Sequence, residues 1–239
     1  MQNEPISLEP SSPRLDEPAP PFEGRSTQGP VKLADFAGRW LVLFAHPADF
    51  TPVCTSEFVT FARRSAEFEA LDCKLLGLSV DSVYAHLAWL ESIREHFGVS
   101  VDFPILEDVS MEIARHYGMI QPRNVRNAAV RALFVIDPAG KVRAMLYYPV
   151  DVGRSVNEVL RLLQALQTAD RLQVVTPEGW APGDDAVEPP PETVSAINDR
   201  RDRAKNGNRD ENYGCVDWYY YKRPADDPSG PGAASRTRM

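Results

Sequence analysis

The sequence predicts an α/β fold, a central mixed β-sheet flanked by helices, followed by a C-terminal arm. Two short and nearly continuous apolar runs, at residues 40–45 (WLVLFA) and 74–80 (KLLGLSV), are typical of strands buried on both faces. Between them, apolar residues recur every three or four positions, which indicates an amphipathic helix and therefore a strand, helix, parallel strand unit. After Val175 the composition becomes rich in proline and acidic residues, which marks the arm.

The helices of the first half follow from the spacing of their apolar residues. The helix between the two strands is predicted from six positions, namely Phe58, Phe61, Ala62, Ser65, Phe68 and Leu71. Ser82 is a suitable N-cap for a second helix that extends to about His96. We expect the buried stripe of this second helix to contain Val83, Leu87, Leu90 and either Ile93 or Arg94.

The second half of the domain is predicted to add a strand, a hairpin and two helices. A third strand is expected at residues 103–106 (FPIL), and a short helix from about Met111 to Tyr117. The runs at residues 132–137 (ALFVID) and 142–148 (VRAMLYY) flank Pro138-Ala139-Gly140, so they predict an antiparallel hairpin. A last helix is expected over about residues 155–168, where apolar residues again have helical spacing.

The chain is predicted to divide into four parts. We expect a flexible N-terminal extension at residues 1–14, an α/β domain at residues 15–175, an arm at residues 176–223 and a disordered tail at residues 224–239. The arm has no long periodic segment, but it contains Cys215, Trp218 and three consecutive tyrosines. It is too aromatic for a solvated linker, so we expect it to pack on this subunit or on another.

Composition and charge exclude several classes of function. The formal net charge is −8, from 34 acidic and 26 basic residues, without a long basic block, so neither nucleic acid nor an anionic membrane is an expected partner. The first residues lack the order of a signal peptide, and no apolar run approaches the ~20 residues of a membrane-spanning helix, so we expect a cytoplasmic protein. Three cysteines and four histidines without zinc-site spacing predict neither a disulfide framework nor a metal or cofactor site.

The stretch HPADFTPVCTSEF, at residues 46–58, places a cysteine in the first turn of a helix that begins at about Pro52. A thiol reacts as its thiolate, and an unperturbed thiol of pKa ~8.5 is only ~3% ionised at pH 7. A shift of ~2 pKa units needs roughly 2.7 kcal/mol, more than the ~0.3–1 kcal/mol that a surface helix terminus contributes. We therefore expect a cation close to Cys54.

Four residues of this sequence form a motif that resembles the active site of peroxiredoxins. Pro47, Thr51 and Cys54 match the family's PxxxTxxC pattern, and Arg131 stands just before a predicted strand, where the family has its active-site arginine. The stretches LLGLSVDS, YPVDVGRSVNEVLRLLQAL and TPEGWAPGD resemble the 1-Cys peroxiredoxins with a long C-terminal arm. The similarity extends from about residue 15 to 184 and more weakly to about 223. It implies a thioredoxin-like fold.

The resemblance implies an antioxidant peroxidase whose cysteine, here Cys54, attacks a hydroperoxide and becomes a sulfenic acid. Thr51 would hydrogen-bond to sulfur or peroxide, Arg131 would stabilise the thiolate and the leaving oxygen, and Pro47 would shield the thiolate from water. By the same resemblance, Glu57 would orient an arginine, Arg154 would be a second cation, and His46 would line the pocket. The implied partners are a hydroperoxide, a thiol reductant (a thioredoxin-like protein or a small thiol) and further subunits, in a homodimer or a larger ring.

Cys215 leaves two interpretations open. The segment YGCVDWYYYKR resembles relatives with two C-terminal cysteines six residues apart, but here the second position is Tyr221. Either Cys215 resolves the sulfenic acid, or it is a free cysteine of the arm and an external thiol completes the cycle. Cys73 is expected in the core, and His86, His96 and His116 on helix surfaces or at interfaces.

Two other functions were weighed against the peroxidase. A thiol-disulfide oxidoreductase on the same fold is disfavoured, because the position three residues after Cys54 is Glu57 and the CxxC pair is absent. A redox-sensing or holdase assembly that uses the oxidation of Cys54 as a signal remains open as an additional role.

Overall fold

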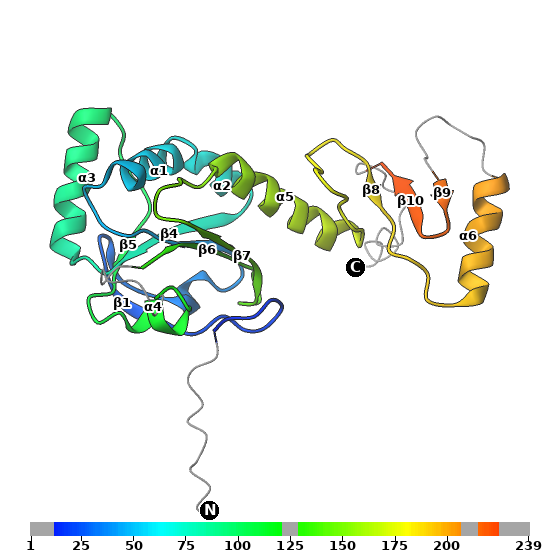
Figure 1. Cartoon of the computed structure of the whole chain (residues 1–239), viewed down its shortest axis with the longest axis horizontal. Helices are drawn as coiled ribbons and strands as arrows, with labels where there is room; N and C mark the ends of the chain where they lie inside the picture. Colours follow the sequence, from blue (N-terminus) through cyan, green and yellow to red (C-terminus); the bar gives the residue numbers. More distant parts are fainter. Residues whose placement is uncertain (1–11, 121–128, 207–214, 225–239) are drawn as a thin grey trace, which may run out of the picture. The chain divides into compact units, whose positions relative to one another are not determined.

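The computed structural model describes residues 12–120, 129–206 and 215–224, apart from the side chains of residues 204–206 and 215. The chain forms two compact units, Met1–Val156 and Asn157–Met239, and each is described by itself (Figure 1). The two units divide between Val156 and Asn157, earlier in the chain than the domain boundary predicted between residues 175 and 176. That domain boundary stays a prediction. The predicted flexible start (1–14) and disordered tail (224–239) lie almost entirely outside the described residues.

The first unit is built on a seven-stranded mixed sheet with the order β2-β1-β5-β4-β3-β6-β7 (Figure 1). Its strands are β1 (Glu23–Ser26), β2 (Gly29–Lys32), β3 (Trp40–Ala45), β4 (Cys73–Ser79), β5 (Ile105–Glu107), β6 (Arg131–Ile136) and β7 (Val142–Tyr148). The three central strands β3, β4 and β5 are parallel, and β6 and β7 form the predicted antiparallel hairpin beside them. The predicted mixed α/β architecture is therefore confirmed.

Helices connect and flank these strands. They are η1 (Leu33–Phe36), α1 (Pro52–Arg63), α2 (Ser65–Ala70), α3 (Val83–Phe97) and α4 (Glu112–His116). The single helix expected between β3 and β4 is broken, because Arg64 leaves helical geometry with φ −112° and ψ 10°. The chain thus turns between α1 and α2, and Phe68 of α2 is still fully buried.

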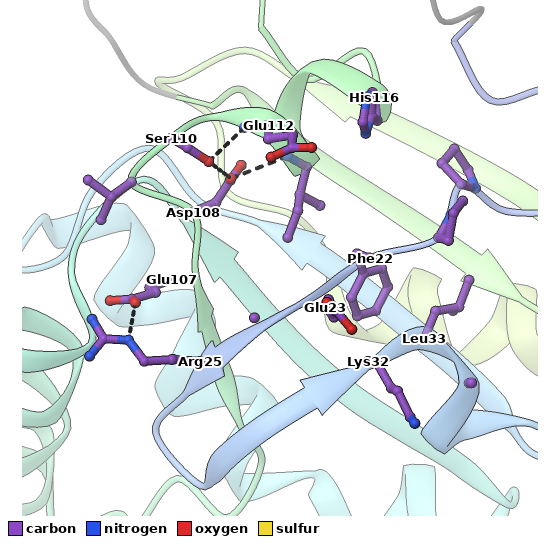
Figure 2. A pocket seen from close by; sticks show the side chains of 16 residues that line it. Phe22, Glu23, Arg25, Lys32, Leu33, Glu107, Asp108, Ser110, Glu112 and His116 are labelled. Atoms are coloured by element: carbon purple, nitrogen blue, oxygen red, sulfur yellow. Dashed lines mark hydrogen bonds and ion pairs between the residues drawn. The ribbon is translucent and has the colours of Figure 1, made fainter.

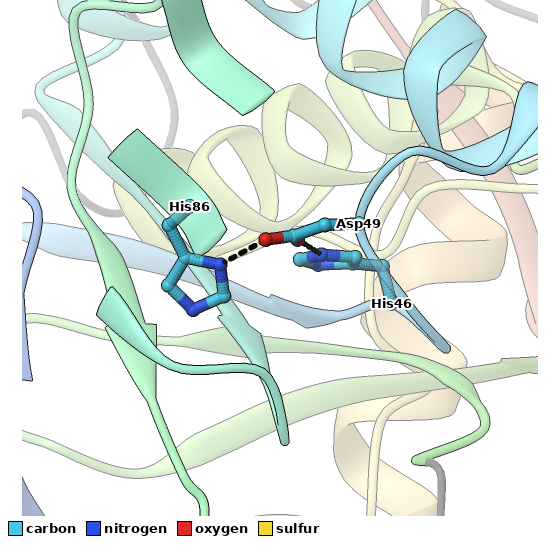
Figure 3. Close-up of side chains that lie close together, drawn as sticks. All are labelled: His46, Asp49 and His86. Atoms are coloured by element: carbon cyan, nitrogen blue, oxygen red, sulfur yellow. Dashed lines mark hydrogen bonds and ion pairs between the residues drawn. The ribbon is translucent and has the colours of Figure 1, made fainter. Parts of the chain in front are cut away.

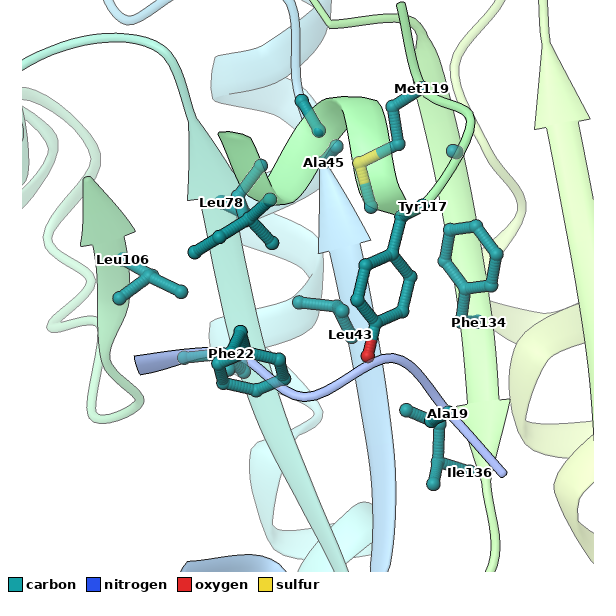
Figure 4. Close-up of a cluster of buried hydrophobic side chains, with 14 of the residues drawn as sticks. Ala19, Phe22, Leu43, Ala45, Leu78, Leu106, Tyr117, Met119, Phe134 and Ile136 are labelled. Carbon is teal, nitrogen blue, oxygen red and sulfur yellow. The ribbon is translucent and has the colours of Figure 1, made fainter. Parts of the chain in front are cut away.

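Alternating side chains of β3 point into two separate cores. Leu41, Leu43 and Ala45 belong to a cluster that also contains Phe22 and Tyr117, from the N-terminal segment and the end of α4 (Figure 4). On the opposite face, Phe44 stacks on Phe61 of α1, with a ring-centroid distance of 4.4 Å. Burial of each such side chain contributes roughly 1.5–3 kcal/mol, so β3 is anchored on both faces where it leads into α1.

Strands β1 and β2 were not predicted, because EGRS and GPVK have little apolar alternation. They pair with each other through a tight turn and join the sheet at β5. The segment before β1 is held along the β6–β7 hairpin by backbone hydrogen bonds. One of them runs from the Asp16 N–H to the Val142 carbonyl at 2.7 Å. The phenol of Tyr117 also donates to the Pro20 carbonyl at 2.7 Å.

The predicted inner stripe of α3 was partly wrong. Val83 and Ile93 are buried as expected, but Leu87 is 48% exposed, and the stripe is completed by His86 and Trp89. The prediction that His86 lies on a surface or at an interface was therefore wrong in this chain, since its ring is fully buried. A polar ring is tolerated there because it contacts a buried carboxylate.

The second unit contains α5 (Val156–Leu172) apart from its first residue, together with β8 (Ala186–Val187), α6 (Val194–Asn206), β9 (Cys215–Asp217) and β10 (Tyr220–Arg223). Its strands form a sheet with the order β8-β10-β9. Helix α6 was not expected, because its sequence, VSAINDRRDRAKN, is almost entirely polar. Thr193 precedes it, and its hydroxyl accepts a hydrogen bond from the Ala196 N–H at 3.2 Å. Among the described residues, no helix has the length and apolar character needed to cross a membrane.

Candidate active site

The sheet topology brings three distant segments to one edge. Strand β3 ends at Ala45 and leads into α1, and β6 runs antiparallel to β3, so that its first residue, Arg131, lies at the same edge. Strand β7 runs antiparallel to β6 and ends at this edge too, with Tyr148 opposite Arg131. The loop that follows β7 contains Arg154. The topology therefore brings Cys54 on α1 close to two arginines, Arg131 at the start of β6 and Arg154 in the loop after β7.

Helix α1 begins at Pro52, as predicted, and this places Cys54 in its first turn. Thr51 is the N-cap residue, but its hydroxyl does not cap the helix and instead donates to the Ala48 carbonyl at 2.8 Å. Because the side chain of the N-cap residue accepts no helix amide, the positive end of the helix dipole is left to act on Cys54. The oxygen of the Thr51 hydroxyl also keeps its capacity to accept a hydrogen bond.

Arg131 makes the contact that the sequence argument required. Its Nη1 lies 3.3 Å from the sulfur of Cys54, a residue 77 positions away, and 2.9 Å from Oε2 of Glu57. Its Nε donates to the carbonyl of Val150 at 3.0 Å, which fixes the plane of the guanidinium. Cys54 is fully buried and Arg131 is 2% exposed, so this cation is little screened by water.

Glu57 joins the two arginines. One helical turn after Cys54, it accepts from Arg154 at three points, from the backbone N–H (2.7 Å), Nε (2.9 Å) and Nη2 (2.7 Å). Burial alone would raise the pKa of Glu57, but the hydrogen bonds and charge of Arg154, with the charge of Arg131, outweigh it and hold this pKa below its usual value. Arg154 also donates through Nη1 to the carbonyls of Ala45 and Ala132, each at 2.8 Å.

His46 lies beside a carboxylate that the sequence did not single out. Its Nε2 is 2.7 Å from Oδ1 of Asp49, and Oδ2 of Asp49 is 2.7 Å from Nδ1 of His86 (Figure 3). Burial lowers the pKa of His46, although the hydrogen bond with Asp49 opposes this. Pro47 follows His46 directly in the loop that leads to Thr51.

The same three residues have the donor types of a metal site. The ligand atoms of His46, Asp49 and His86 lie within 4.8 Å of one another. Each carboxylate oxygen, however, is at hydrogen-bond distance from one imidazole nitrogen, so the arrangement as it stands is a hydrogen-bonded triad. We assign no metal to it.

Neither of two detected cavities of the first unit includes a predicted site residue. The larger, about 1130 Å³, lies against β1 and α4 and is lined by side chains that include Phe22, Lys32 and His116 (Figure 2). The smaller, about 130 Å³, lies between η1 and the turn of the β6–β7 hairpin. The residues predicted for the site are therefore described by their contacts and not by either of these cavities.

The other cysteines differ from Cys54 in their surroundings. Cys73 is buried in β4, as expected, and burial raises the pKa of its thiol to about 12. Cys215 is the first residue of β9 in the second unit, paired through its backbone with Tyr221, and its side chain lies outside the described residues. Among the cysteine side chains that are described, only that of Cys54 contacts an arginine.

Sequence reasoning missed Asp49, His86 and the Val150 carbonyl. A backbone carbonyl cannot be singled out from residue type. Asp49 lies three residues after His46 within the motif-bearing loop, and that spacing was a usable signal. His86 would have been found if the stripe of α3 had been extended to polar residues.

Comparison with known proteins identifies the family. Residues 15–145 match the AhpC/TSA family, and residues 165–203 match the C-terminal domain of 1-Cys peroxiredoxin. A peroxiredoxin of Aquifex aeolicus is 50% identical over 224 residues, which cover 89% of this chain and 97% of that protein. The chain belongs to the AhpC/TSA family of peroxiredoxins. It is therefore a thiol-dependent peroxidase, and the predicted family is confirmed.

Other peroxiredoxins show how far the similarity extends. A peroxiredoxin of Methanosarcina mazei is 43% identical and covers 87% of this chain and 95% of its own. The solved structure of the yeast mitochondrial 1-Cys peroxiredoxin matches with a TM-score of 0.77 and 38% identity, over 88% of this chain and 99% of that one. Peroxiredoxin 6 of Arenicola marina matches with a TM-score of 0.72 and 35% identity, over 76% and 86%. These solved structures bear out the thioredoxin-like peroxiredoxin fold.

Proposed function

We propose that this peroxiredoxin reduces hydrogen peroxide and organic hydroperoxides with Cys54 as the peroxidatic nucleophile. The observation that carries the proposal is the 3.3 Å contact between Arg131 Nη1 and the sulfur of Cys54, in a buried helix N-terminus. A fixed guanidinium favours the thiolate over the thiol and cannot lose its charge. The role of Cys54 therefore rests on geometry as well as on the family motif.

The reaction consists of one displacement at oxygen. The thiolate of Cys54 donates an electron pair to the terminal oxygen of ROOH, the O–O bond breaks, and the products are a sulfenic acid and RO⁻, which takes up a proton to leave as ROH. Sulfur is oxidised and the peroxide is reduced. Arg131 stabilises the negative charge that develops on the leaving oxygen, and the hydroxyl oxygen of Thr51 accepts a hydrogen bond from the peroxide O–H, which becomes the O–H of the sulfenic acid.

The supporting residues keep these groups in place. Glu57 accepts from both arginines, and this holds Nη1 of Arg131 toward sulfur. Arg154 neutralises Glu57 and ties the loop after β7 to β3 and β6. Pro47, which has no N–H, and His46 lie in the loop before α1, and we expect them to line the place where the peroxide reaches Cys54.

The sulfenic acid returns to the thiol with two reducing equivalents from two thiol groups: the first forms a disulfide with Cys54 and releases water, and the second reduces that disulfide by exchange. We propose that an external thiol, a thioredoxin-like protein or a small thiol, supplies them, directly or after Cys215 has formed a disulfide with Cys54. The yeast relative was studied for thiol resolution via glutathione and thioredoxin systems, and such reductants are the first to test. A free thiolate needs a reducing compartment, so we place the protein in the cytoplasm.

We also propose that the protein acts as a homodimer or a larger ring. The second unit exposes apolar side chains, with Val216 73% and Tyr219 54% accessible in the single chain, which suits an intersubunit contact. Sedimentation velocity of the reduced protein tests this. A monomer at micromolar concentration contradicts it.

Stopped-flow mixing with hydrogen peroxide tests the central proposal. Reduced protein should react far faster than a free thiol. Tryptophan fluorescence follows the rate, and mass spectrometry detects the trapped sulfenic acid. Cys54→Ser should abolish the reaction, and Arg131→Ala should slow it by about 10²-fold or more. Cys73→Ala is the matched control and should react like the wild type. A wild-type rate equal to that of a free thiol refutes the peroxidase assignment of Cys54.

The role of Cys215 is decided by a separate experiment. On non-reducing electrophoresis after one equivalent of peroxide, a Cys54–Cys215 crosslink that Cys215→Ser removes assigns the resolving role to Cys215. Absence of the crosslink in the wild type assigns the reduction to an external thiol alone.

A further inference from the structure

His86 is a fully buried side chain near the active site for which the proposed function has no use. It comes from the first turns of α3, 37 residues from Asp49 in the sequence, and its Nδ1 lies 2.7 Å from Oδ2 of that carboxylate. Oδ1 of the same carboxylate lies 2.7 Å from Nε2 of His46. Asp49 thus links α3 to the residue that follows β3, with one imidazole on each of its oxygens (Figure 3).

The protons of this triad follow from the chemistry of its groups. Burial would raise the pKa of Asp49, but the hydrogen bonds and charges of His46 and His86 outweigh it, and the pKa lies below its usual value. An ionised carboxylate only accepts, so His46 carries its proton on Nε2 and His86 on Nδ1. The opposite ring nitrogens, His46 Nδ1 and His86 Nε2, are buried and have no partner among the described residues.

Asp49 also fixes the backbone of the loop that carries Pro47 and Thr51. Its N–H donates to Oδ2 of Asp81 at 2.9 Å, and Asp81 is in turn held by the hydroxyl of Ser79 at 2.8 Å. The next residue, Phe50, has a left-handed backbone with φ +56° and an exposed ring. A bulky residue adopts this conformation only when its neighbours enforce it. The contacts of Asp49 constrain the backbone at Phe50, the residue directly before Thr51.

His86 adds to this constraint a contact from α3, beside the contact that Asp81 makes with the Asp49 backbone. If its Nδ1–H is lost, Asp49 keeps one imidazole donor, and the carboxylate is free to turn toward His46 or away from it. The ring of His46 then loses its fixed tautomer and orientation, as happens to a histidine whose orienting group is removed. The strained turn at Phe50 keeps the bond from the Asp49 N–H to Asp81 but loses the fixed position of the neighbouring Asp49 side chain.

We propose that His86 is a positioning residue of the peroxidase site, which acts through Asp49 to fix the tautomer of His46 and the conformation of the loop before Cys54. This rests on the proposed function of Cys54. His86 itself touches no reacting atom. It acts on the site by fixing the positions of Thr51 and His46.

The charged groups around the triad define its pH response. Asp49 contacts both rings, Arg154 acts on His46, and Glu107 at the end of β5 interacts with His86 while paired with Arg25. Asp81 faces the Asp49 backbone. Removal of the His86 donor leaves the charges of Arg154, Asp81 and Glu107 in place. Without the His86 donor, we therefore expect protonation of Asp49 and His46 to make the rate of the reaction with peroxide depend on pH.

The test compares two substitutions at one position. His86→Leu removes the donor, whereas His86→Asn presents an amide N–H close to the place of Nδ1–H. We expect His86→Leu to react with hydrogen peroxide about 10-fold to 100-fold more slowly and to lose further rate as the pH falls from about 8 to about 5. His86→Asn should recover most of the rate and the wild-type pH profile. His96→Leu, at an exposed histidine of the same helix, is the matched control and should match the wild type.

Nitrogen-15 NMR of the four histidines provides a readout that does not depend on activity. In the wild type, His46 should show the Nε2–H tautomer and His86 the Nδ1–H tautomer. In His86→Leu the His46 signal should shift toward a tautomer mixture or the protonated ring. If His86→Leu does not fold, His86→Phe, which keeps an aromatic ring but has no donor, replaces it with the same expectations.

Two results overturn the inference. One is a donor-free variant with the wild-type rate, pH profile and His46 tautomer. The other is equal slowing of His86→Asn and the donor-free variant with an unchanged pH profile, which would make His86 a packing residue. Failure of the proposed function looks different, since the wild type would then show no fast reaction and Cys54→Ser would change nothing.

Discussion

At the residue scale, Glu57 is the carboxylate on which both buried arginines depend. It receives four hydrogen bonds from Arg131 and Arg154, and its side chain is 2% exposed. We predict that Glu57→Gln lowers the free energy of unfolding by about 3–5 kcal/mol, because two guanidinium groups then lack their anion. The reaction with peroxide should slow as well, since Arg131 is no longer held against the sulfur. Urea unfolding and stopped-flow kinetics measure the two effects.

The control for this prediction is an exposed ion pair of the same chain. Glu67 on α2 pairs with Arg64 at 2.6 Å, but its side chain is 54% exposed. Solvent and salt screen such pairs, so Glu67→Gln should leave both stability and rate nearly unchanged. Equal effects of the two substitutions would mean that Glu57 does not act through its buried arginines.

At the element scale, α1 lies against β4 at a glycine. An added Cβ at Gly77 would come within 3.0 Å of Cζ of Phe58, and the ring of Phe58 lies 4.8 Å from that of His46 and 4.7 Å from that of Trp89. We predict that Gly77→Ala destabilises the protein by about 1–3 kcal/mol through overpacking. Combination with Phe58→Leu should recover part of the loss, which a double-mutant cycle measures. Strict additivity would show that the ring is not what resists the methyl group.

A second prediction at this scale concerns the arm. Arg200 of α6 is 7% exposed and joins the helix to the strands, with Nη2 2.9 Å from Glu188 and Nη1 3.0 Å from the Pro189 carbonyl and 3.1 Å from the Trp218 carbonyl. Arg200→Met should leave the partners of the guanidinium unsatisfied and increase amide hydrogen exchange in β8, β10 and α6. Exchange in β3 and β4 should not change, because these strands belong to the other unit. If the amides of β8, β10 and α6 exchange as slowly in Arg200→Met as in the wild type, the prediction is contradicted.

At the scale of the whole molecule, the sequence was informative where burial is two-sided and the periodicity is strong. Strands β3, β4 and β6 and the start of α1 at Pro52 were predicted, because apolar runs and a proline at the first helical position have few alternative structures. The polar strands β1 and β2 and helix α6 were missed, since tertiary contacts and not local apolar spacing stabilise them. Within the site, the convergence of Cys54, Arg131 and Glu57 depends on sheet register, which only the resemblance could supply. His86 on the buried stripe of α3 was missed, because its partner carboxylate lies 37 positions away.

The acid response of the whole protein follows from the buried groups of this site. Burial holds the pKa of His46 below its ordinary value, so the unfolded chain takes up a proton at about pH 6.5 that the folded protein does not yet bind. Stability is therefore independent of this group above about pH 6.5 and falls as the pH decreases below it, by up to ~1.4 kcal/mol per pH unit. Asp49 and Glu57, whose pKa values are lowered, stabilise the fold above about pH 4 and lose that contribution only in stronger acid.

This separation of the two pH ranges makes the contribution of His46 measurable. Glutamine can place an amide N–H where Nε2–H of His46 meets Asp49, but it does not titrate. We predict that His46→Gln flattens the dependence of the unfolding free energy on pH between about 6.5 and 5, whereas His96→Gln, at an exposed ring, leaves it as in the wild type. Urea titrations at a series of pH values measure the slope. An unchanged slope in His46→Gln would mean that this ring takes up its proton equally well in the folded and unfolded chain, which its complete burial beside Asp49 argues against.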